Sequence, residues 1–290
     1  MSDEKKKEID DVSGVETTGH EWDGLKELNN PSPRWWIWVW IACTVWAVGY
    51  WVFYPTWPTL AGNTKGILGW TSHNQLVAAQ DKLSARQDVY LERFEGASLK
   101  EIMADPELYA FAVAGGNAAF KDNCATCHGS GGVGGKGFPN LNDDDWLWGG
   151  ALEDIQQTIT YGIRSGHDEA RQSQMSAFGA DELLEKDEIS AVVDYVLSLS
   201  GGEKAESYAQ GKEIFADNCA ACHGEDAKGG RDFGAPNLTD SIWLYGGERE
   251  DVYETVFYAR RGVMPTWAGR LDENTIRQLT IYVHELGGGE

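Results

Sequence analysis

The stretch that decides the fold is Cys124-Ala125-Thr126-Cys127-His128, and its pattern returns as Cys219-Ala220-Ala221-Cys222-His223. Cys-x-x-Cys-His is the spacing at which haem is attached covalently to a protein chain. Thiols three positions apart project from nearly one face of a helical turn, so each can bond one vinyl group of the same porphyrin. The histidine that follows then lies under the iron as its proximal ligand. We therefore predict two covalently bound haems, held by Cys124, Cys127, Cys219 and Cys222 and coordinated by His128 and His223.

Cys-x-x-Cys also occurs in zinc sites, redox-active dithiols and structural disulfides. The histidine that follows directly in both copies favours haem, and the glycine-rich surroundings lack the strand–helix–strand context of a thioredoxin-like dithiol. A shared zinc site would have to bring together two motifs that are 95 residues apart. The fifth cysteine, Cys43, lies in an apolar span and is expected to be a packing residue.

That apolar span, WWIWVWIACTVWAVGYWVFY, runs for 20 residues from Trp35 to Tyr54 without a charge. At the rise of a helix it crosses a hydrocarbon core of about 30 Å, and tryptophan and tyrosine gather toward its ends, where the headgroups lie. A buried helix of a soluble core is the alternative. A long polar stretch precedes the span, so it does not resemble a cleaved signal peptide and should remain as a single membrane anchor.

Flanking charge predicts the orientation of this anchor. The basic residues that precede it are Lys5, Lys6, Lys7, Lys26 and Arg34, whereas only Lys65 follows soon after it. Because positive charge favours the cytoplasmic side, residues 1–34 should lie in the cytoplasm and the rest of the chain in the periplasm of a bacterial inner membrane. Residues 1–30 are polar and are expected to be poorly ordered without a partner.

Beyond the anchor the chain repeats itself. Gly116, Phe120 and Cys124 correspond to Gly211, Phe215 and Cys219, and after a slip of two residues Pro139, Trp146 and Gly149 correspond to Pro236, Trp243 and Gly246. Each repeat opens with a helix, passes through the motif and a glycine-rich loop, and closes with an apolar-periodic helix. The expected organisation is all-α: a cytoplasmic arm (1–34), a transmembrane helix (35–54), a periplasmic helical linker (55–104) and two haem domains (105–200 and 203–290).

The repeat also nominates the second axial ligand of each iron. Met175 and Met264 lie 47 and 41 residues after their motif histidines, each in a loop before the closing helix, so each is expected to complete the haem of its own repeat. The sequence leaves open whether these ligands are instead crossed between the two domains. A packing role is the alternative for both, and it is the expected role for Met103, which has no counterpart. His167 could compete with Met175, because an imidazole is also an iron ligand.

The linker has a helical pattern of its own. Apolar residues recur at helical spacing from residue 76 to residue 94, and Ser98-Leu99-Lys100-Glu101 has the pattern of a capping box. We expect a helical arm here that contacts neighbouring subunits.

The formal net charge is −22, and the two predicted haem domains carry about −11 and −7 of it. A strongly acidic surface excludes nucleic acid as a partner and attracts a basic one, with a rate that depends on salt. Solubility alone is the alternative explanation of any single acidic run.

The two repeats resemble class I cytochromes c, in which a proline carbonyl supports the proximal histidine and an aromatic residue of the last helix packs on the first helix. Pro139 and Pro236 match the prolines, and the matching aromatic pairs are Phe120 with Tyr195 and Phe215 with Tyr282. The whole chain resembles the dihaem subunit, subunit III, of the cbb3-type cytochrome c oxidases. The specific parts are GHEWDGLKELNNPSPRWW before the anchor, YPTWP after it, and RRGVMPTWAGRLDENT near the C-terminal end.

The resemblance implies an electron-entry role in aerobic respiration and its coupled proton transport. Such subunits accept electrons from a donor cytochrome c and pass them through a monohaem partner subunit to a catalytic haem-copper subunit. No catalysis is expected on this chain itself, because His and Met would close both irons. Two rival functions remain at this stage: a dihaem peroxidase, which would need an open iron position, and a membrane-tethered shuttle or dehydrogenase subunit, which would share every haem feature.

Overall fold

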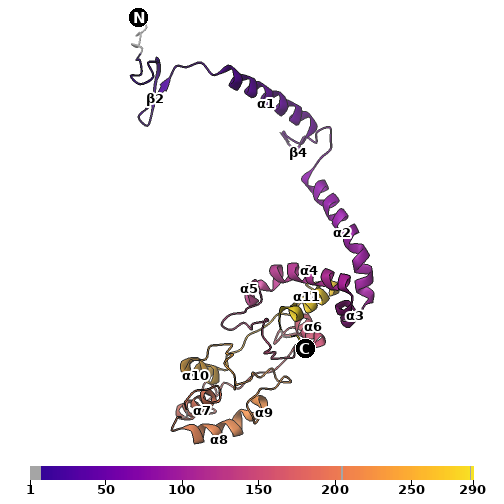
Figure 1. The fold of residues 1–290 in the computed structure, drawn as a ribbon, viewed down its shortest axis with the longest axis vertical. Coiled ribbons are helices and arrows are strands. Elements are labelled where there is room, and N and C mark those ends of the chain that lie inside the picture. The colour runs from indigo at the N-terminus through magenta and orange to yellow at the C-terminus, as the bar shows by residue number, and fades with distance from the viewer. Residues whose placement is uncertain (1–7, 204, 288) are drawn as a thin grey trace. The chain divides into compact units, whose positions relative to one another are not determined.

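The computed structural model describes residues 8–203, 205–287 and 289–290. The chain divides into two compact units, one ending at Ala85 and one running from Arg86 to Glu290 (Figure 1). Lys5, Lys6 and Lys7, on which part of the orientation argument depends, lie outside the described residues.

The first unit opens with a β-hairpin. Strands β1 (Thr17–Trp22) and β2 (Leu25–Leu28) pair antiparallel, and Trp22 faces Leu25 across the turn. Asp23 and Gly24 both have positive φ, 50° and 86°, which is the backbone of the tight hairpin turn that Asp-Gly favours. The expectation that residues 1–30 lack order is therefore wrong for residues 17–28, where the Asp-Gly signal was overlooked.

The membrane-anchor candidate is α1 (Arg34–Phe53), one residue offset from the predicted span. It is 20 residues long, an 18-residue window within it has a mean hydropathy of 1.5, and none of its residues is buried within the chain. This exposure disagrees with a core helix, whose apolar side chains would be covered by protein. After the short pair β3 (Pro58–Thr59) and β4 (Gly62–Asn63), the chain returns to the end of α1, where the amides of Ile67 and Leu68 bond its last carbonyls.

Helix α2 (Ser72–Gly96) spans the boundary between the units, and its last turns pack in the second one. The predicted capping box is confirmed: at the start of α3 (Leu99–Ala104), the Ser98 hydroxyl accepts a hydrogen bond from the amide of Glu101. Arg277 fixes this arm from the far end of the sequence, because its buried guanidinium donates to the carbonyl of Phe94 at 2.9 Å and lies 4.9 Å from the centre of the Phe94 ring.

The remaining helices of the second unit form two bundles. The first bundle consists of α4 (Pro106–Asn123), α5 (Ala125–His128), α6 (Leu152–Tyr161) and α11 (Glu273–Leu286). The second bundle consists of α7 (Lys186–Leu199), α8 (Tyr208–Asn218), α9 (Ala220–His223) and α10 (Arg249–Tyr258). Each bundle thus contains one motif, but its closing helix comes from the other repeat (Figure 1).

The aromatic pairs show the exchange directly. Phe120 of α4 lies 5.4 Å from Tyr282 of α11, and Phe215 of α8 lies 5.4 Å from Tyr195 of α7, measured between ring centres. The expected pairs, Phe120 with Tyr195 and Phe215 with Tyr282, were wrong. Because both repeats carry the same aromatic pattern, the pattern fits either pairing.

Glycine permits the close crossing of helices in both bundles. A Cβ atom on Gly116 would lie 2.3 Å from the carbonyl oxygen of Gln278, and one on Gly211 would lie 2.1 Å from that of Ala191. The contacts again join α4 to α11 and α8 to α7. The predicted repeat residues therefore have the expected packing role, with exchanged partners.

Candidate haem-binding site

Each Cys-x-x-Cys-His motif forms a single helical turn at the end of a longer helix. Cys124 ends α4, and its carbonyl accepts the amides of Cys127 at 3.1 Å and His128 at 3.0 Å. The second motif repeats both bonds at the same distances, from Cys222 and His223 to the carbonyl of Cys219. The turn places both thiols of a motif toward one side, as attachment to one porphyrin requires.

The competing interpretations of the motifs find no support in the geometry. All five cysteines are free thiols, which disagrees with a structural disulfide. Within the described part of the chain, no three His, Cys, Asp or Glu side chains are grouped to hold a metal ion, which disagrees with a shared zinc site. Each motif offers two thiols and one imidazole, which is the donor set that covalently bound haem uses.

Both motif histidines are oriented by a proline carbonyl, as expected from the class I resemblance. His128 Nδ1 lies 3.2 Å from the oxygen of Pro139, and His223 Nδ1 lies 3.1 Å from that of Pro236. A carbonyl only accepts hydrogen bonds, so each Nδ1 carries the proton and each Nε2 keeps a free lone pair. Burial lowers the pKa of both histidines, so they are neutral at pH 7 and suited to bind iron.

The first cysteine of each motif faces an apolar environment. Cys124 packs against the core of the first bundle and Cys219 against that of the second. Burial raises the pKa of each thiol to about 11. Apolar walls of this kind suit a porphyrin ring, and the residues present therefore fit covalently bound haem.

Met264 lies in the bundle of the opposite motif. It packs against the core of the first bundle, to which Cys124 also belongs, and exchanges two backbone hydrogen bonds of 3.0 Å with Ile163. Two further bonds join the residues that follow it to Thr160 of α6. The neighbours of Met264 therefore belong to the bundle of the first motif rather than to that of its own repeat.

Met175 shows the reciprocal placement. The chain just after it runs along the end of α10, where the amides of Gly179 and Ala180 bond the carbonyl of Phe257 at 3.2 and 3.0 Å. Phe257 lies 97 residues after Thr160 and has the equivalent place in the second repeat. Because the carbonyl of Thr160 bonds the Met264 loop, the two methionine loops are attached in the same way. The loop that follows Met175 is thus attached to the second bundle.

The other candidate ligands have separate contacts. The ring of His167 lies 4.8 Å from that of Tyr161, measured between ring centres and tilted by 33°, and its Nδ1 accepts a hydrogen bond from the amide of Glu169 at 3.1 Å. That bond leaves the ring proton on Nε2, so this tautomer has no lone pair for iron. Met103 packs with the arm formed by α2 and α3, as predicted.

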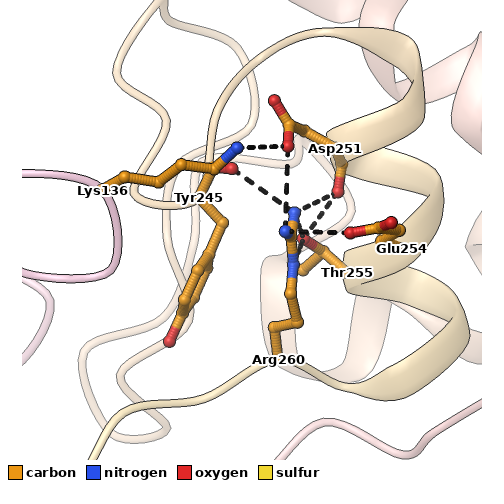
Figure 2. Close-up of polar contacts among 6 residues, drawn as sticks. All are labelled: Lys136, Tyr245, Asp251, Glu254, Thr255 and Arg260. Carbon is orange, nitrogen blue, oxygen red and sulfur yellow. Dashed lines mark hydrogen bonds and ion pairs between the residues drawn. The ribbon is translucent and has the colours of Figure 1, made fainter.

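A charged cluster ties the two bundles together (Figure 2). Lys136, from the loop after the first motif, donates to Asp251 of α10 at 2.6 Å. Arg260 lies 3.7 Å from the same carboxylate and 5.1 Å from the centre of the Tyr245 ring. The backbone of this loop also contacts the second repeat, since the amide of Gly137 donates to the carbonyl of Leu244 at 2.7 Å.

The cluster changes the acidity of its central carboxylate. The bonded ammonium of Lys136, and to a lesser extent Arg260, lowers the pKa of Asp251. Asp251 therefore stays ionised well into the acid range. No sequence signal predicts this cluster, because no spacing rule relates a lysine in one repeat to an aspartate 115 residues later.

Two family models match the chain. The model of the N-terminal domain of cytochrome oxidase-cbb3, FixP, matches residues 14–61, and that of cytochrome c oxidase, cbb3-type, subunit III matches residues 111–196 and 206–283. The chain belongs to the cbb3-type subunit III family. The first match covers the hairpin, α1 and β3, and the second covers most of both repeats.

Curated relatives agree with this membership along the whole chain. The chain is 53% identical over 285 residues to a cbb3-type cytochrome c oxidase subunit FixP of Bradyrhizobium sp. (strain ORS 278), covering 98% of each chain. It is 52% identical over 276 residues to a subunit CcoP of Cereibacter sphaeroides, covering 94% of this chain and 95% of that one. The expected resemblance to cbb3-type subunit III is confirmed, and the N-terminal stretch that suggested it lies within the first match.

Proposed function

We propose that this chain is the electron-transfer cytochrome subunit of a cbb3-type oxidase. It accepts electrons from a donor cytochrome c and passes them toward the subunit that reduces oxygen. The observation that supports this role most strongly is the duplicated motif, in which both histidines have Nδ1 bonded to a proline carbonyl and Nε2 free. Relatives of the same length and half-identical sequence have the name of this oxidase subunit.

We further propose two haems with exchanged methionine ligands. The first haem is attached to Cys124 and Cys127 and coordinated by His128 and Met264. The second haem is attached to Cys219 and Cys222 and coordinated by His223 and Met175. The packing of Met264 with the first bundle and the attachment of the Met175 loop to α10 support this assignment.

Each haem iron, when bound, carries one electron by changing between the ferric and ferrous states. The protein contributes the axial ligands and the apolar surroundings, and a thioether opposite the imidazole favours the ferrous state. If His128 with Met264, and His223 with Met175, held the two irons, neither iron would keep an open position for a substrate. This arrangement favours electron transfer over a dihaem peroxidase.

The membrane placement follows from the anchor. α1 attaches the chain to the bacterial inner membrane, and we propose that the haem bundles lie in the periplasm. Lys26 before the helix and Arg34 at its first position, against Lys65 soon after it, support a cytoplasmic N-terminus.

The proposed partners are a monohaem cytochrome subunit, the catalytic haem-copper subunit and a basic donor cytochrome c. The net charge of −22 supports a basic donor, because complementary charge speeds encounter. A membrane-tethered shuttle or a dehydrogenase subunit would have the same haem sites, so the partners decide between these functions.

Extraction of the native membrane in mild detergent, followed by mass spectrometry of the associated chains, tests the function. Recovery with a multi-span haem-copper subunit and a monohaem cytochrome is expected. Recovery alone, or with a dehydrogenase, would contradict the oxidase assignment and leave the haem assignment intact.

Methionine-to-histidine variants test the ligand exchange. In a chain that keeps only the first haem, through Cys219→Ser and Cys222→Ser, we expect Met264→His to lower the midpoint potential, because imidazole favours ferric iron more than a thioether does. Met175→His in the same background is the matched control and should leave the potential nearly unchanged. The opposite result would show that each methionine serves its own repeat.

A further inference from the structure

Arg164 occupies the point where the two methionine loops cross. It follows α6, in a short extended segment where Ile163 pairs antiparallel with Met264 and parallel with Arg171. Its own amide bonds the carbonyl of Arg171 at 2.9 Å. The segment with Ile163 and Arg164 therefore lies between two stretches of chain. One contains Arg171 and leads to Met175, and the other contains Met264.

The side chain of Arg164 bonds both loops. Nε donates to the carbonyl of Gly262 at 2.8 Å, and Nη1 donates to the carbonyl of Ser173 at 2.9 Å. Gly262 lies two residues before Met264, and Ser173 lies two residues before Met175. One planar guanidinium thus fixes the approach to both methionines, which a flexible single-point donor such as lysine could not do.

The backbone and charge of Arg164 both cost free energy. Its φ of 52° is in the left-handed region, which side chains other than glycine and asparagine rarely adopt. Burial opposes its charge and lowers its pKa, and the nearby Arg261 adds to this effect. No described carboxylate forms an ion pair with it, although the chain is strongly acidic. A half-buried cation that bonds only carbonyls at this place indicates a role in the site rather than general stability.

We propose that Arg164 is a positioning residue that holds both methionine loops over their irons and sets the two haem potentials together. The proposal rests on the exchanged ligand set described above. By fixing the two loops, Arg164 keeps each thioether within reach of its iron. Its positive charge, bonded to both methionine loops, favours the ferrous state of both irons, because reduction of ferric iron adds an electron and removes one positive charge.

The repeat supplies a matched control. Arg261 lies 97 residues after Arg164, at the equivalent place in the second repeat, but its side chain is exposed and makes no hydrogen bond among the described residues. Arg261→Gln removes one positive charge from the same neighbourhood without releasing either loop. Comparison with Arg164→Gln therefore separates positioning from charge alone.

The test is a redox titration of the purified full-length haem-loaded chain in detergent, with the methionine–iron(III) charge-transfer band and cyanide binding as ligation readouts. For Arg164→Gln we expect the ferrous-to-ferric ratio at a given potential to fall about tenfold at both haems. For a one-electron couple this is a fall of about 59 mV in each midpoint potential. Both haems should lose band intensity and bind cyanide about tenfold more tightly, because the charge-assisted hydrogen bonds that hold each loop are lost. Arg261→Gln should leave the band and cyanide binding unchanged.

A change at only one haem, or equal changes in the two variants, would overturn the proposal. If Arg164→Gln does not retain haem, Arg164→Lys decides, because it keeps the charge but cannot bond both carbonyls. Tighter cyanide binding at both haems is then expected, and unchanged binding would refute the role. A wild-type chain without the methionine band would refute the ligand set itself, whereas a wild-type band that is insensitive to Arg164 would refute only this inference.

Discussion

The exchange of closing helices predicts an energetic coupling between two residues 165 positions apart. Asn117 of α4 donates through Nδ2 to the hydroxyl of Tyr282 of α11 at 2.9 Å. Both groups are partly buried and neutral, so the bond should contribute about 1 kcal/mol to the free energy of unfolding. Tyr282→Phe removes the hydroxyl and keeps the ring that packs on Phe120, so it creates no cavity.

A double-mutant cycle isolates this bond. Asn117→Ala also changes helix propensity, but that effect is the same with Tyr or Phe at position 282 and cancels in the cycle. We expect a coupling energy of about 1 kcal/mol between Asn117→Ala and Tyr282→Phe. The assay is guanidinium unfolding of the haem-loaded chain in detergent, followed by haem absorption.

Tyr195→Phe is the matched control, because Tyr195 has the same place in the other closing helix and packs on Phe215. Its coupling to Asn117→Ala should be close to zero. Coupling of Asn117 to Tyr195 instead of Tyr282 would refute the exchanged packing, and with it the reasoning on the methionine loops.

Two further predictions concern packing and pH. Gly116→Ala should destabilise the first bundle by about 2 kcal/mol, because its Cβ would lie 2.3 Å from the backbone oxygen of Gln278. For Gly115→Ala the free energy of unfolding should stay within about 1 kcal/mol of wild type, because its Cβ meets the movable side-chain amide of Gln278 and alanine favours the helix. Equal unfolding midpoints for the two variants would contradict the close crossing. The pKa of Asp251 is lowered from its ordinary 3.8 when folded, so its pairing with Lys136 stabilises the fold above about pH 4 and is lost as pH falls through the depressed pKa. Lys136→Met should therefore weaken the dependence of the urea midpoint on pH below about 4, and an unchanged acid limb would show that the pair contributes nothing.

Features encoded within a few neighbouring residues could be read from the sequence. The motif turns, the capping box at Ser98 and the span of α1 each depend on local spacing, and the structure has all three. The β-hairpin at residues 17–28 was also readable, because Asp23-Gly24 lies between its two strands, but the polar composition concealed it.

Contacts between distant residues could not be read in the same way. Arg164 gives no sequence signal for its two carbonyl partners, because backbone acceptors are present at every residue. Lys136 and Asp251 are two charges among many, and only the fold brings them within 2.6 Å.

The sequence alone determined that this protein has two Cys-x-x-Cys-His motifs, one apolar span and two similar helical repeats. Only the tertiary structure decided which closing helix packs with which motif, and beside which bundle each methionine loop lies. Phe120 and Phe215, like Tyr195 and Tyr282, have the same pattern in both repeats, so local pattern leaves the pairing degenerate. The short connection through residues 200–207 joins α7 to α8, and the low entropic cost of closing a short loop favours packing between these sequence neighbours. Once α7 covers α8, the apolar face of α4 is left for α11.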